Sequence, residues 1–307
     1  MSPERAAAVE KMTVRDAPSG PRVSVVVPLF QKERYIGRTV ASVLAQTFTD
    51  FELVVLDNAS TDGSVAEVRA FAEDPRLRLE HNPETVPMTA NFARAVELSR
   101  APLVKVLMAD DLLTPTALAE QVALMDADPS LALVSCRHDL VDDADRVIAR
   151  GRALRSPDLL GRQEAATVLR RIVRHRGSPL GVPGNMLFRR TAFDAAGGFP
   201  EWAYALDVGL AARLVTQGAF YGMPSSLSQF RLAGGSSTST ARKENVAEQH
   251  AFLRSLRREH PDVVRPRDVA LGLARQPVTW LRERLMMVAA DDPHSVRHRV
   301  AARVLRL

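Results

Sequence analysis

Two short apolar runs with a helical pattern between them decide the fold, and the first of them reads Val23-Ser-Val-Val-Val27. Pro28 ends this run, and the second run, Leu53-Val-Val-Leu56, is followed at once by Asp57. Continuous apolar runs of this length are typical of strands buried on both faces of a parallel sheet. Between the runs, apolar residues recur at helical spacing, at positions 36, 40, 43 and 44. The stretch therefore predicts a strand, a helix and a second strand.

The same alternation continues to about residue 130. The patterns that follow are, in order, a helix over 65–71, a strand at Arg76–His81, a helix over 89–98 and a strand at Leu103–Met108. Thr114-Pro115 reads as an N-cap followed by proline at the first helical position. Farther on, Leu131–Ser135 reads as a strand and Val141–Ile148 as a turn between two strand ends. The order favours an α/β fold with a single Rossmann-like, mostly parallel sheet flanked by helices.

The composition is that of an ordinary globular protein, with 46% hydrophobic and 25% charged residues. A single cysteine, Cys136, excludes an internal disulfide and a cysteine-based zinc site, and it suits a reducing cytoplasm. No segment approaches the roughly 18 continuous apolar residues that a membrane-spanning helix needs. Residues 1–20 are polar and lack the apolar core of a secretory signal, so we expect a disordered leader.

Acidic residues follow two of the predicted strands at the point where each strand ends. Asp57 comes directly after one buried run, and Asp110-Asp111 follow the strand that ends near Met108. In an open parallel sheet, ligands bind beyond the carboxyl ends of the strands, so these acids are expected to meet at one edge. A carboxylate pair there can hold a divalent cation, which in turn can bind a diphosphate. The alternative is that the acids are only turn residues and helix caps.

The chain has no glycine-rich phosphate loop. Neither a GxGxxG pattern after the first strand nor a GxxxxGK[ST] pattern occurs. If a diphosphate binds, a cation must supply the positive charge that such loops supply elsewhere. The absence therefore favours a metal role for the acid pair.

Three segments carry a resemblance to a known family. They are Val23–Phe30 with Ser42–Gly63, which includes Ser-Val-Leu-Ala-Gln and Asp-Asn-Ala-Ser-Thr-Asp; Lys105-Val-Leu-Met-Ala-Asp-Asp-Leu-Leu-Thr-Pro115; and Phe188-Arg-Arg-Thr-Ala-Phe-Asp-Ala-Ala-Gly-Gly-Phe-Pro200. Together they resemble the inverting family 2 glycosyltransferases of GT-A fold. The likeness spans roughly residues 21–240. Gln31, Asn58 and Ala109 stand where that family commonly has Asn, Asp and Asp, and Ala233 stands where it often has His.

The resemblance implies a role for each matching residue. Nucleotide-sugar binding is implied for Pro28, Phe30, Asp57, Asn58, Asn91, Asp110 and Arg231. Asp111, with Asp110, would bind Mg²⁺ or Mn²⁺ in the family's DxD-like region. Asp207 occupies the place of the catalytic base, although it could also be read as a helix N-cap. Pro28 and Phe30 would line the base pocket, and Arg231 would lie near the diphosphate.

The function expected is transfer of a sugar from a UDP- or dTDP-linked donor to an unidentified hydroxyl acceptor, with inversion and metal assistance. The cation stabilises the leaving diphosphate, and a carboxylate on the opposite face takes the proton of the acceptor hydroxyl. Two alternatives stay open. One is a sugar-1-phosphate nucleotidyltransferase, although the Pro28–Gln31 loop does not resemble the basic, glycine-rich loop that it needs. The other is a non-catalytic sugar-nucleotide-binding module.

The implied organisation has a GT-A domain at 21–240, with a nucleotide-binding half at 21–112 and an acceptor half at 113–240, and a helical extension at 241–307. Residues 242–307 hold 14 Lys/Arg against 8 Asp/Glu, although the whole chain carries a net charge of only +5. The extension could pack on the catalytic domain, bind a partner or contact an anionic membrane surface at its inner face. Nucleic-acid binding is not expected, because aromatic residues are not interleaved with the basic ones. Homo-oligomerisation is left open.

Overall fold

The computed structural model describes residues 20–175, 178–232 and 243–275. The predicted leader, apart from its last residue, and residues 276–307 lie outside this part of the chain. The strands are β1 Val23–Leu29, β2 Phe51–Asp57, β3 Leu77–His81, β4 Leu103–Val106, β5 Leu112–Leu113, β6 Leu131–Val141, β7 Val147–Arg152, β8 Gly161–Gln163, β9 Met186–Arg189 and β10 Ala219–Arg231. They form one sheet in the order β3-β2-β1-β4-β9-β6-β10-β5, with β7 paired to β6 and β8 to β10.

The α/β fold predicted from the alternating pattern is confirmed. Strands β1 to β4 pair in parallel in the order β3-β2-β1-β4, and the long pairing of β6 with β10 is also parallel. Antiparallel pairing is confined to the short strands β5, β7, β8 and β9. The two parallel groups are joined through β9, which lies between β4 and β6 in the sheet. All carboxyl ends of β1 to β4 therefore meet at one edge, as the sequence predicts.

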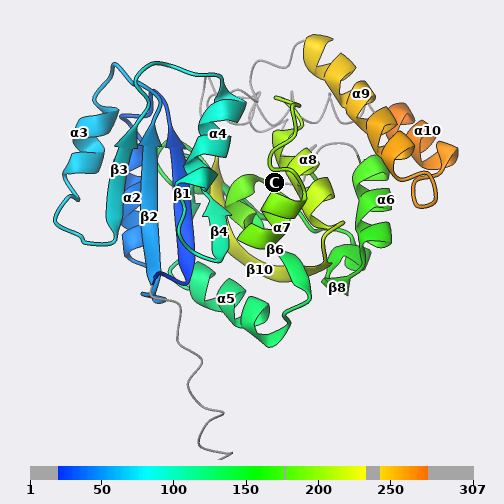
Figure 1. The fold of residues 1–307 in the computed structure, drawn as a ribbon, viewed down its shortest axis with the longest axis horizontal. Helices are drawn as coiled ribbons and strands as arrows, with labels where there is room; N and C mark the ends of the chain where they lie inside the picture. Colours follow the sequence, from blue (N-terminus) through cyan, green and yellow to red (C-terminus); the bar gives the residue numbers. More distant parts are fainter. Residues whose placement is uncertain (1–19, 176–177, 233–242, 276–307) are drawn as a thin grey trace, which may run out of the picture.

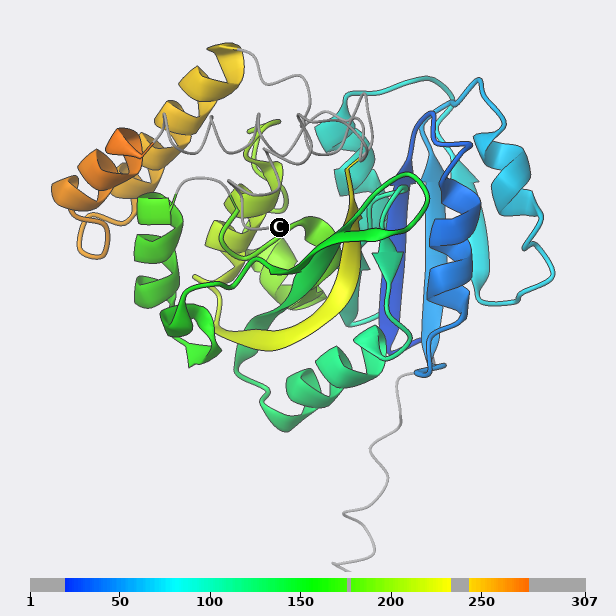
Figure 2. The same ribbon diagram turned by 180° about the vertical axis from the view of Figure 1, so that it is seen from behind.

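Helices cover both faces of the sheet. They are α2 Ile36–Leu44, α3 Ser64–Arg69, α4 Met88–Glu97, α5 Ala117–Ala127, α6 Ala165–His175, α7 Arg190–Ala195, α8 Leu206–Leu214, α9 Lys243–Glu259 and α10 Pro266–Ala274, with 3₁₀ turns η1 Pro157–Leu159 and η2 Pro183–Asn185. Helices α2 and α5 pack into one apolar core, and α4, α6, α7 and α8 into the other. Figures 1 and 2 show α4 and α2 on opposite faces of the β1–β2 region.

Two local predictions need correction. Thr114 does not cap a helix: its hydroxyl donates to the Leu227 carbonyl at 3.2 Å, and α5 begins at Ala117. The residues just before Thr114 form β5, which pairs with β10. Strand β6 is also longer than the predicted Leu131–Ser135, since it continues to Val141 and is buried along almost its whole length. The polar residues within β6 hid this continuation, because they break the apolar run in the sequence.

The described part of the C-terminal extension is helical and packs on the main domain (Figure 1). Helix α10 approaches α6 so closely that a Cβ at Gly272 would lie 2.2 Å from the Val173 carbonyl oxygen. The Asp268 carboxylate is fully buried and pairs with Arg174 at 2.6 Å. No helix in the described residues is long and apolar enough to cross a bilayer. Membrane or partner contact by residues 276–307 stays a prediction, as do the domain boundaries.

Strand β4 places a lysine in the centre of the sheet. Lys105 has no exposed surface, and its ammonium donates to the Gln121 amide oxygen at 2.8 Å and to the Met186 carbonyl at 3.3 Å. Gln121 in turn donates to the Asn185 carbonyl at 2.7 Å. Lys105 thereby ties β4 to α5 and to the start of β9. Burial of the ammonium lowers the pKa of Lys105 to about 8.

This pKa predicts a pH-dependent stability. Between about pH 8 and 10.5 the unfolded chain holds a proton on Lys105 that the folded chain has released, so the free energy of unfolding rises with pH. We expect wild type to gain about 1 kcal/mol relative to Lys105→Met between pH 7 and pH 9. Denaturant unfolding of both proteins across this range measures the difference. A constant difference would contradict a depressed lysine pKa.

Candidate active site

The carboxyl ends of β1, β2 and β3 align at one edge of the sheet. The register places Leu29 beside Asp57, and Asp57 beside His81. The Asp57 carboxylate is 3% exposed and accepts the Ser60 backbone N–H at 3.2 Å. His81 Nδ1 lies 3.4 Å from its other oxygen. Asp57 is therefore positioned by the turn that follows β2, at the edge where the sequence places it.

The loop after β1 presents an apolar ring at this edge. Pro28 is buried within β1, whereas Phe30 is 44% exposed, one of few large apolar side chains so exposed in the described residues. The loop is held to the loop after β2, because the Gln31 N–H donates to Ser60 Oγ at 3.1 Å. The Lys32 N–H donates to Ser64 Oγ at 2.7 Å. An exposed ring at this edge of the sheet is a suitable surface for stacking a base.

The acid pair lies beyond the end of β4. Asp111 is 1% exposed, and its Oδ1 accepts the Arg231 backbone N–H at 3.0 Å. Its Oδ2 is buried and has no hydrogen-bond partner among the described residues. Asp110 is paired through Oδ2 with the Lys32 ammonium at 2.5 Å. Lys32 thus connects the β1 loop to the acid pair.

A buried carboxylate oxygen without a partner is costly unless a cation occupies its free side. Burial, and secondly the neighbouring Asp110 charge, raise the pKa of Asp111 well above its usual range. No group of three or more His, Cys, Asp or Glu gathers in the parts of the chain that the structure describes. A hard divalent cation often takes only one or two protein carboxylates, with water and substrate phosphates completing its oxygens. The Asp110–Asp111 pair fits such an ion.

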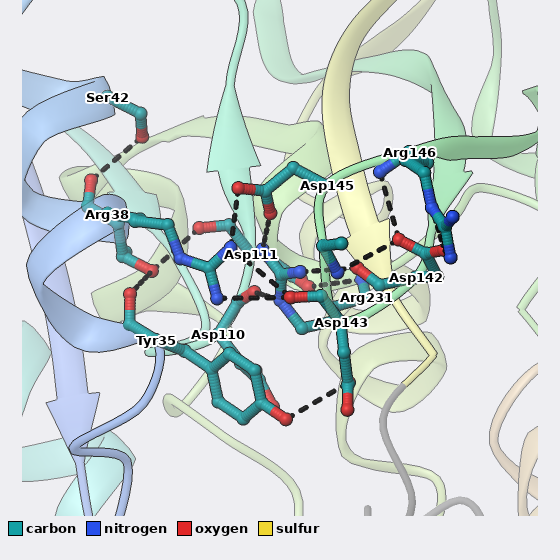
Figure 3. A network of polar contacts seen from close by, with 12 residues as sticks. Tyr35, Arg38, Ser42, Asp110, Asp111, Asp142, Asp143, Asp145, Arg146 and Arg231 are labelled. Atoms are coloured by element: carbon teal, nitrogen blue, oxygen red, sulfur yellow. Dashed lines mark hydrogen bonds and ion pairs between the residues drawn. The ribbon is translucent and has the colours of Figure 1, made fainter. Parts of the chain in front are cut away.

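The turn between β6 and β7 covers the acid pair (Figure 3). It is fastened to α2, because Tyr35 Oη donates to Asp143 at 3.0 Å and Arg38 pairs with Asp145 at 2.6 Å. The fully buried Arg231 side chain holds it from β10, since Nη1 donates to the Asp142 carbonyl at 2.5 Å and Nη2 pairs with Asp145. Figure 3 shows these contacts converging around Arg231.

The Arg231 guanidinium also donates from Nε to the Asp110 carbonyl at 2.9 Å. Its donors are thus directed at the Asp110 backbone and at the β6–β7 turn. In this arrangement Arg231 positions Asp110 and the β6–β7 turn, and the predicted contact with a diphosphate stays a prediction.

Asn58 and Asn91 belong to a buried chain of amides. The Asn58 side chain donates to the Val86 carbonyl at 2.9 Å and accepts from Asn82 at 2.8 Å. Asn82 also donates to Asn91 at 2.8 Å, and Arg94 donates to Asn82 at 2.7 Å. These bonds fix the segment between β3 and α4 against the end of β2. Direct binding of a nucleotide sugar by Asn58 or Asn91 stays a prediction.

Asp207 lies in the first turn of α8 and is partly buried. Burial raises the pKa of Asp207, while the adjacent Val208 N–H and a contact with the Ser178 hydroxyl lower it. The segment before α8 is held from the C-terminal extension, because the Glu248 carboxylate of α9 accepts the Tyr204 N–H at 2.6 Å and the Ala205 N–H at 3.0 Å. The extension therefore helps to position the start of α8.

Residues 178–185 lie close to both Asp111 and Asp207. Ser178 contacts the Asp207 carboxylate at one end of residues 178–185. At the other end, a Cβ added to Gly184 would lie 3.9 Å from the unpartnered Asp111 oxygen and 3.1 Å from Leu107. A side chain at position 184 would thus narrow the space beside Asp111. The segment links Asp207 to the acid pair.

Several residues of this region were not singled out from the sequence. Lys32 contacts Asp110, Ser178 contacts Asp207 and Tyr35 contacts Asp143, but nothing in their local pattern distinguishes them from surface residues. The segment Val141–Ile148, predicted as a turn between two strand ends, connects β6, which ends at Val141, to β7, which begins at Val147.

Comparisons of the sequence with known proteins point to one family. A sequence profile described as "Glycosyl transferase family 2" matches residues 24–197, more than half of the chain. An uncharacterized protein of Mycobacterium tuberculosis is 29% identical over 77% of this chain and 76% of its own length. The putative glycosyltransferase EpsE of Bacillus subtilis is 29% identical over 35% of this chain and 40% of its own length. A chondroitin synthase of Escherichia coli is 32% identical over 43% of this chain but only 19% of its own length.

Solved structures show the same fold at lower identity. S. aureus TarS 1-349 in complex with UDP-GlcNAc has a TM-score of 0.59 at 18% identity, covering 88% of this chain and 82% of that chain. The mannosyltransferase PcManGT from Pyrobaculum calidifontis, in complex with GDP-Man and Mn²⁺, has a TM-score of 0.58 at 21% identity, covering 99% and 84%. Neither the nucleotidyltransferase nor the binding-module alternative is favoured by these comparisons. The chain is a glycosyltransferase enzyme of GT-A fold, and it belongs to glycosyl transferase family 2.

Proposed function

We propose that the chain transfers a sugar from a nucleotide-diphosphate donor to an acceptor hydroxyl, with inversion and with help from Mg²⁺ or Mn²⁺. The observation that carries the proposal is the unpartnered, buried oxygen of Asp111 next to Asp110. A carboxylate in this state favours a cation at its free side, because burial otherwise penalises its charge. When bound, the cation would neutralise the diphosphate as it leaves.

The residues at the strand ends would hold the nucleotide. Phe30 offers an exposed ring for the base, and Asp57 lies at the end of β2, beside Leu29, the residue before Phe30. Lys32, paired with Asp110, would place a positive charge near the phosphates. These contacts would orient the sugar relative to the acid pair, and orientation of this kind lowers the barrier by removing motional freedom before reaction.

Asp207 would take the proton from the acceptor hydroxyl. Its pKa is raised by burial, which brings a carboxylate closer to the range useful for a base at neutral pH. Glu248 and the Ser178 segment fix the start of α8, so the carboxylate would be presented in a set position. The acceptor oxygen then attacks the anomeric carbon as the bond to the diphosphate breaks. The proton ends on an Asp207 oxygen.

A uracil or thymine base is the donor class that we propose. TarS has been seen with UDP-GlcNAc and the mannosyltransferase with GDP-Man, so both support a nucleotide sugar as donor. The test is a thermal-shift series with UDP, dTDP and GDP, each with and without Mn²⁺. A ligand at 100 times its Kd adds about 2.7 kcal/mol of stability, which raises Tm by several degrees.

A shift for UDP or dTDP that depends on Mn²⁺ would support the proposal. A shift only for GDP would overturn the donor class, and equal shifts with Mn²⁺ and with EDTA would overturn the role of the metal. UMP with Mn²⁺ is the matched control, because it has the base but lacks the diphosphate. The anomeric configuration of the product, read by NMR coupling constants, tests inversion.

A further inference from the structure

A polar cavity lies beside the β6–β7 hairpin. It has a volume of about 660 Å³ and is lined by β6, β7, β10 and the segment after β7. Figure 2 shows the hairpin in front of β10, with its turn directed toward α2. The lining residues Thr114 and Gln229 are close in sequence to Asp111 and Arg231, so the cavity neighbours the acid pair without including it.

Three arginines line this cavity: Arg137, Arg150 and Arg155. The lining includes a single acidic residue, Asp139, and its carboxylate already has partners. Asp139 pairs with Arg150 at 3.1 Å and accepts the Gly151 N–H at 2.9 Å. Two guanidinium groups are therefore left without a carboxylate inside the cavity.

These two groups are incompletely bonded. Arg137 donates from Nη2 to the Leu154 carbonyl at 3.3 Å, but its Nε is buried and has no hydrogen-bond partner. Arg155 is exposed, and within residues 20–175, 178–232 and 243–275 its side chain makes no hydrogen bond or ion pair. A buried N–H of a charged group without an acceptor is unfavourable, and a bound oxyanion would supply the acceptor.

The cavity is held open by contacts outside it. The hairpin turn is fastened to α2 and β10 through Asp143 and Asp145, as described above. Gly151 in β7 has a positive φ of 61°, and a Cβ added there would lie 3.9 Å from the Arg137 side chain. The β6–β7 hairpin, which carries Arg137, is therefore held in place, and this reduces the entropy lost on binding.

We propose that this cavity is a second ligand site, which binds a phosphate group through Arg137 and Arg155. The two uncompensated charges match a phosphate monoester, which carries about −1.5 to −2 at neutral pH. Guanidinium forks bind phosphate oxygens in pairs. A volume of about 660 Å³ leaves room for a molecule larger than a bare ion. The site goes beyond sugar transfer and requires no donor.

Calorimetric titration of the full-length chain with inorganic phosphate and with pyrophosphate tests the site. EDTA is present throughout, so that no cation can bridge the ligand to Asp110 and Asp111. We expect saturable binding that becomes about tenfold weaker in Arg155→Met, and weaker still in Arg137→Met/Arg155→Met. Arg69→Met, an exposed arginine on α3, is the matched control and should bind as wild type.

Each outcome decides the proposal. No metal-free binding, or equal binding in wild type and in the double variant, would overturn it. Arg155 is exposed, so its single variant keeps the test valid even if the Arg137 change impairs folding. Citrate is the comparison anion: tighter binding of pyrophosphate than of citrate supports a phosphate site, and the reverse order overturns it. Because no donor is present, failure here leaves the proposed transferase reaction untouched.

Discussion

Asp111→Asn is expected to abolish metal-dependent nucleotide binding and, at the same time, to make the metal-free protein more stable. The two effects have one cause, the buried Oδ2 that lacks a partner. Asn keeps the oxygen that accepts the Arg231 N–H but removes the charge that would attract a cation. An unpaired neutral amide costs less to bury than an unpaired carboxylate. We expect a gain of about 1 kcal/mol, or roughly 2–4 °C in Tm.

The stability gain should depend on pH with a defined sign. The pKa of Asp111 is raised in the folded protein, so the folded chain holds a proton that the unfolded chain has released. Wild-type stability therefore falls as pH rises through this range, and the variant lacks this loss. The advantage of Asp111→Asn should widen as the pH rises above the usual aspartate range. In activity, we expect kcat/KM to fall about 10²- to 10³-fold.

Thermal unfolding with and without Mn²⁺ and nucleoside diphosphate measures both effects on the same samples. Asp126→Asn is the control, since this aspartate is half exposed and pairs with Arg22 away from the acid pair. It should leave the metal-dependent shift intact. A variant at position 111 that still gives the full Mn²⁺-dependent shift would show that the carboxylate is not a metal ligand.

Asp207→Asn is expected to lower kcat by about 10³-fold and to leave donor binding nearly unchanged. The size follows from general-base catalysis, which contributes about 10²- to 10⁴-fold. Asn fills the same volume but cannot accept a proton, so the substitution slows the chemical step and lowers kcat. In wild type, the acidic limb of the rate profile should lie above the usual aspartate range, because burial raises the pKa of Asp207.

The measurement is release of nucleoside diphosphate from the donor, with a panel of hydroxyl acceptors and with water. Donor affinity is read separately from the thermal shift, so a binding defect and a chemical defect can be told apart. Asp194→Asn is the control, an exposed aspartate on α7 that pairs with Arg190. Transfer by Asp207→Asn within threefold of wild type would remove this residue from the base role.

Short-range patterns were sufficient for the sheet and for part of the site. A continuous apolar run such as Val23–Val27 predicts a strand buried on both faces, whichever elements pack against it. Because parallel strands share a direction, the residues after them reach one edge, and this places Asp57 and the acid pair correctly. The full length of β6 could not be predicted in this way, because Arg137, His138 and Asp139 interrupt its apolar pattern although the strand continues.

The amino-acid sequence by itself determined the α/β order, the family and the acids at the strand ends, because each depends on residues close together in the chain. Only the tertiary structure decided which polar groups are satisfied. Arg231 meets Asp145 across 86 residues, and Lys32 meets Asp110 across 78. The same packing leaves one oxygen of Asp111 and the Nε of Arg137 without partners. Desolvation and pairing are set by what packs against a group, which no local pattern specifies.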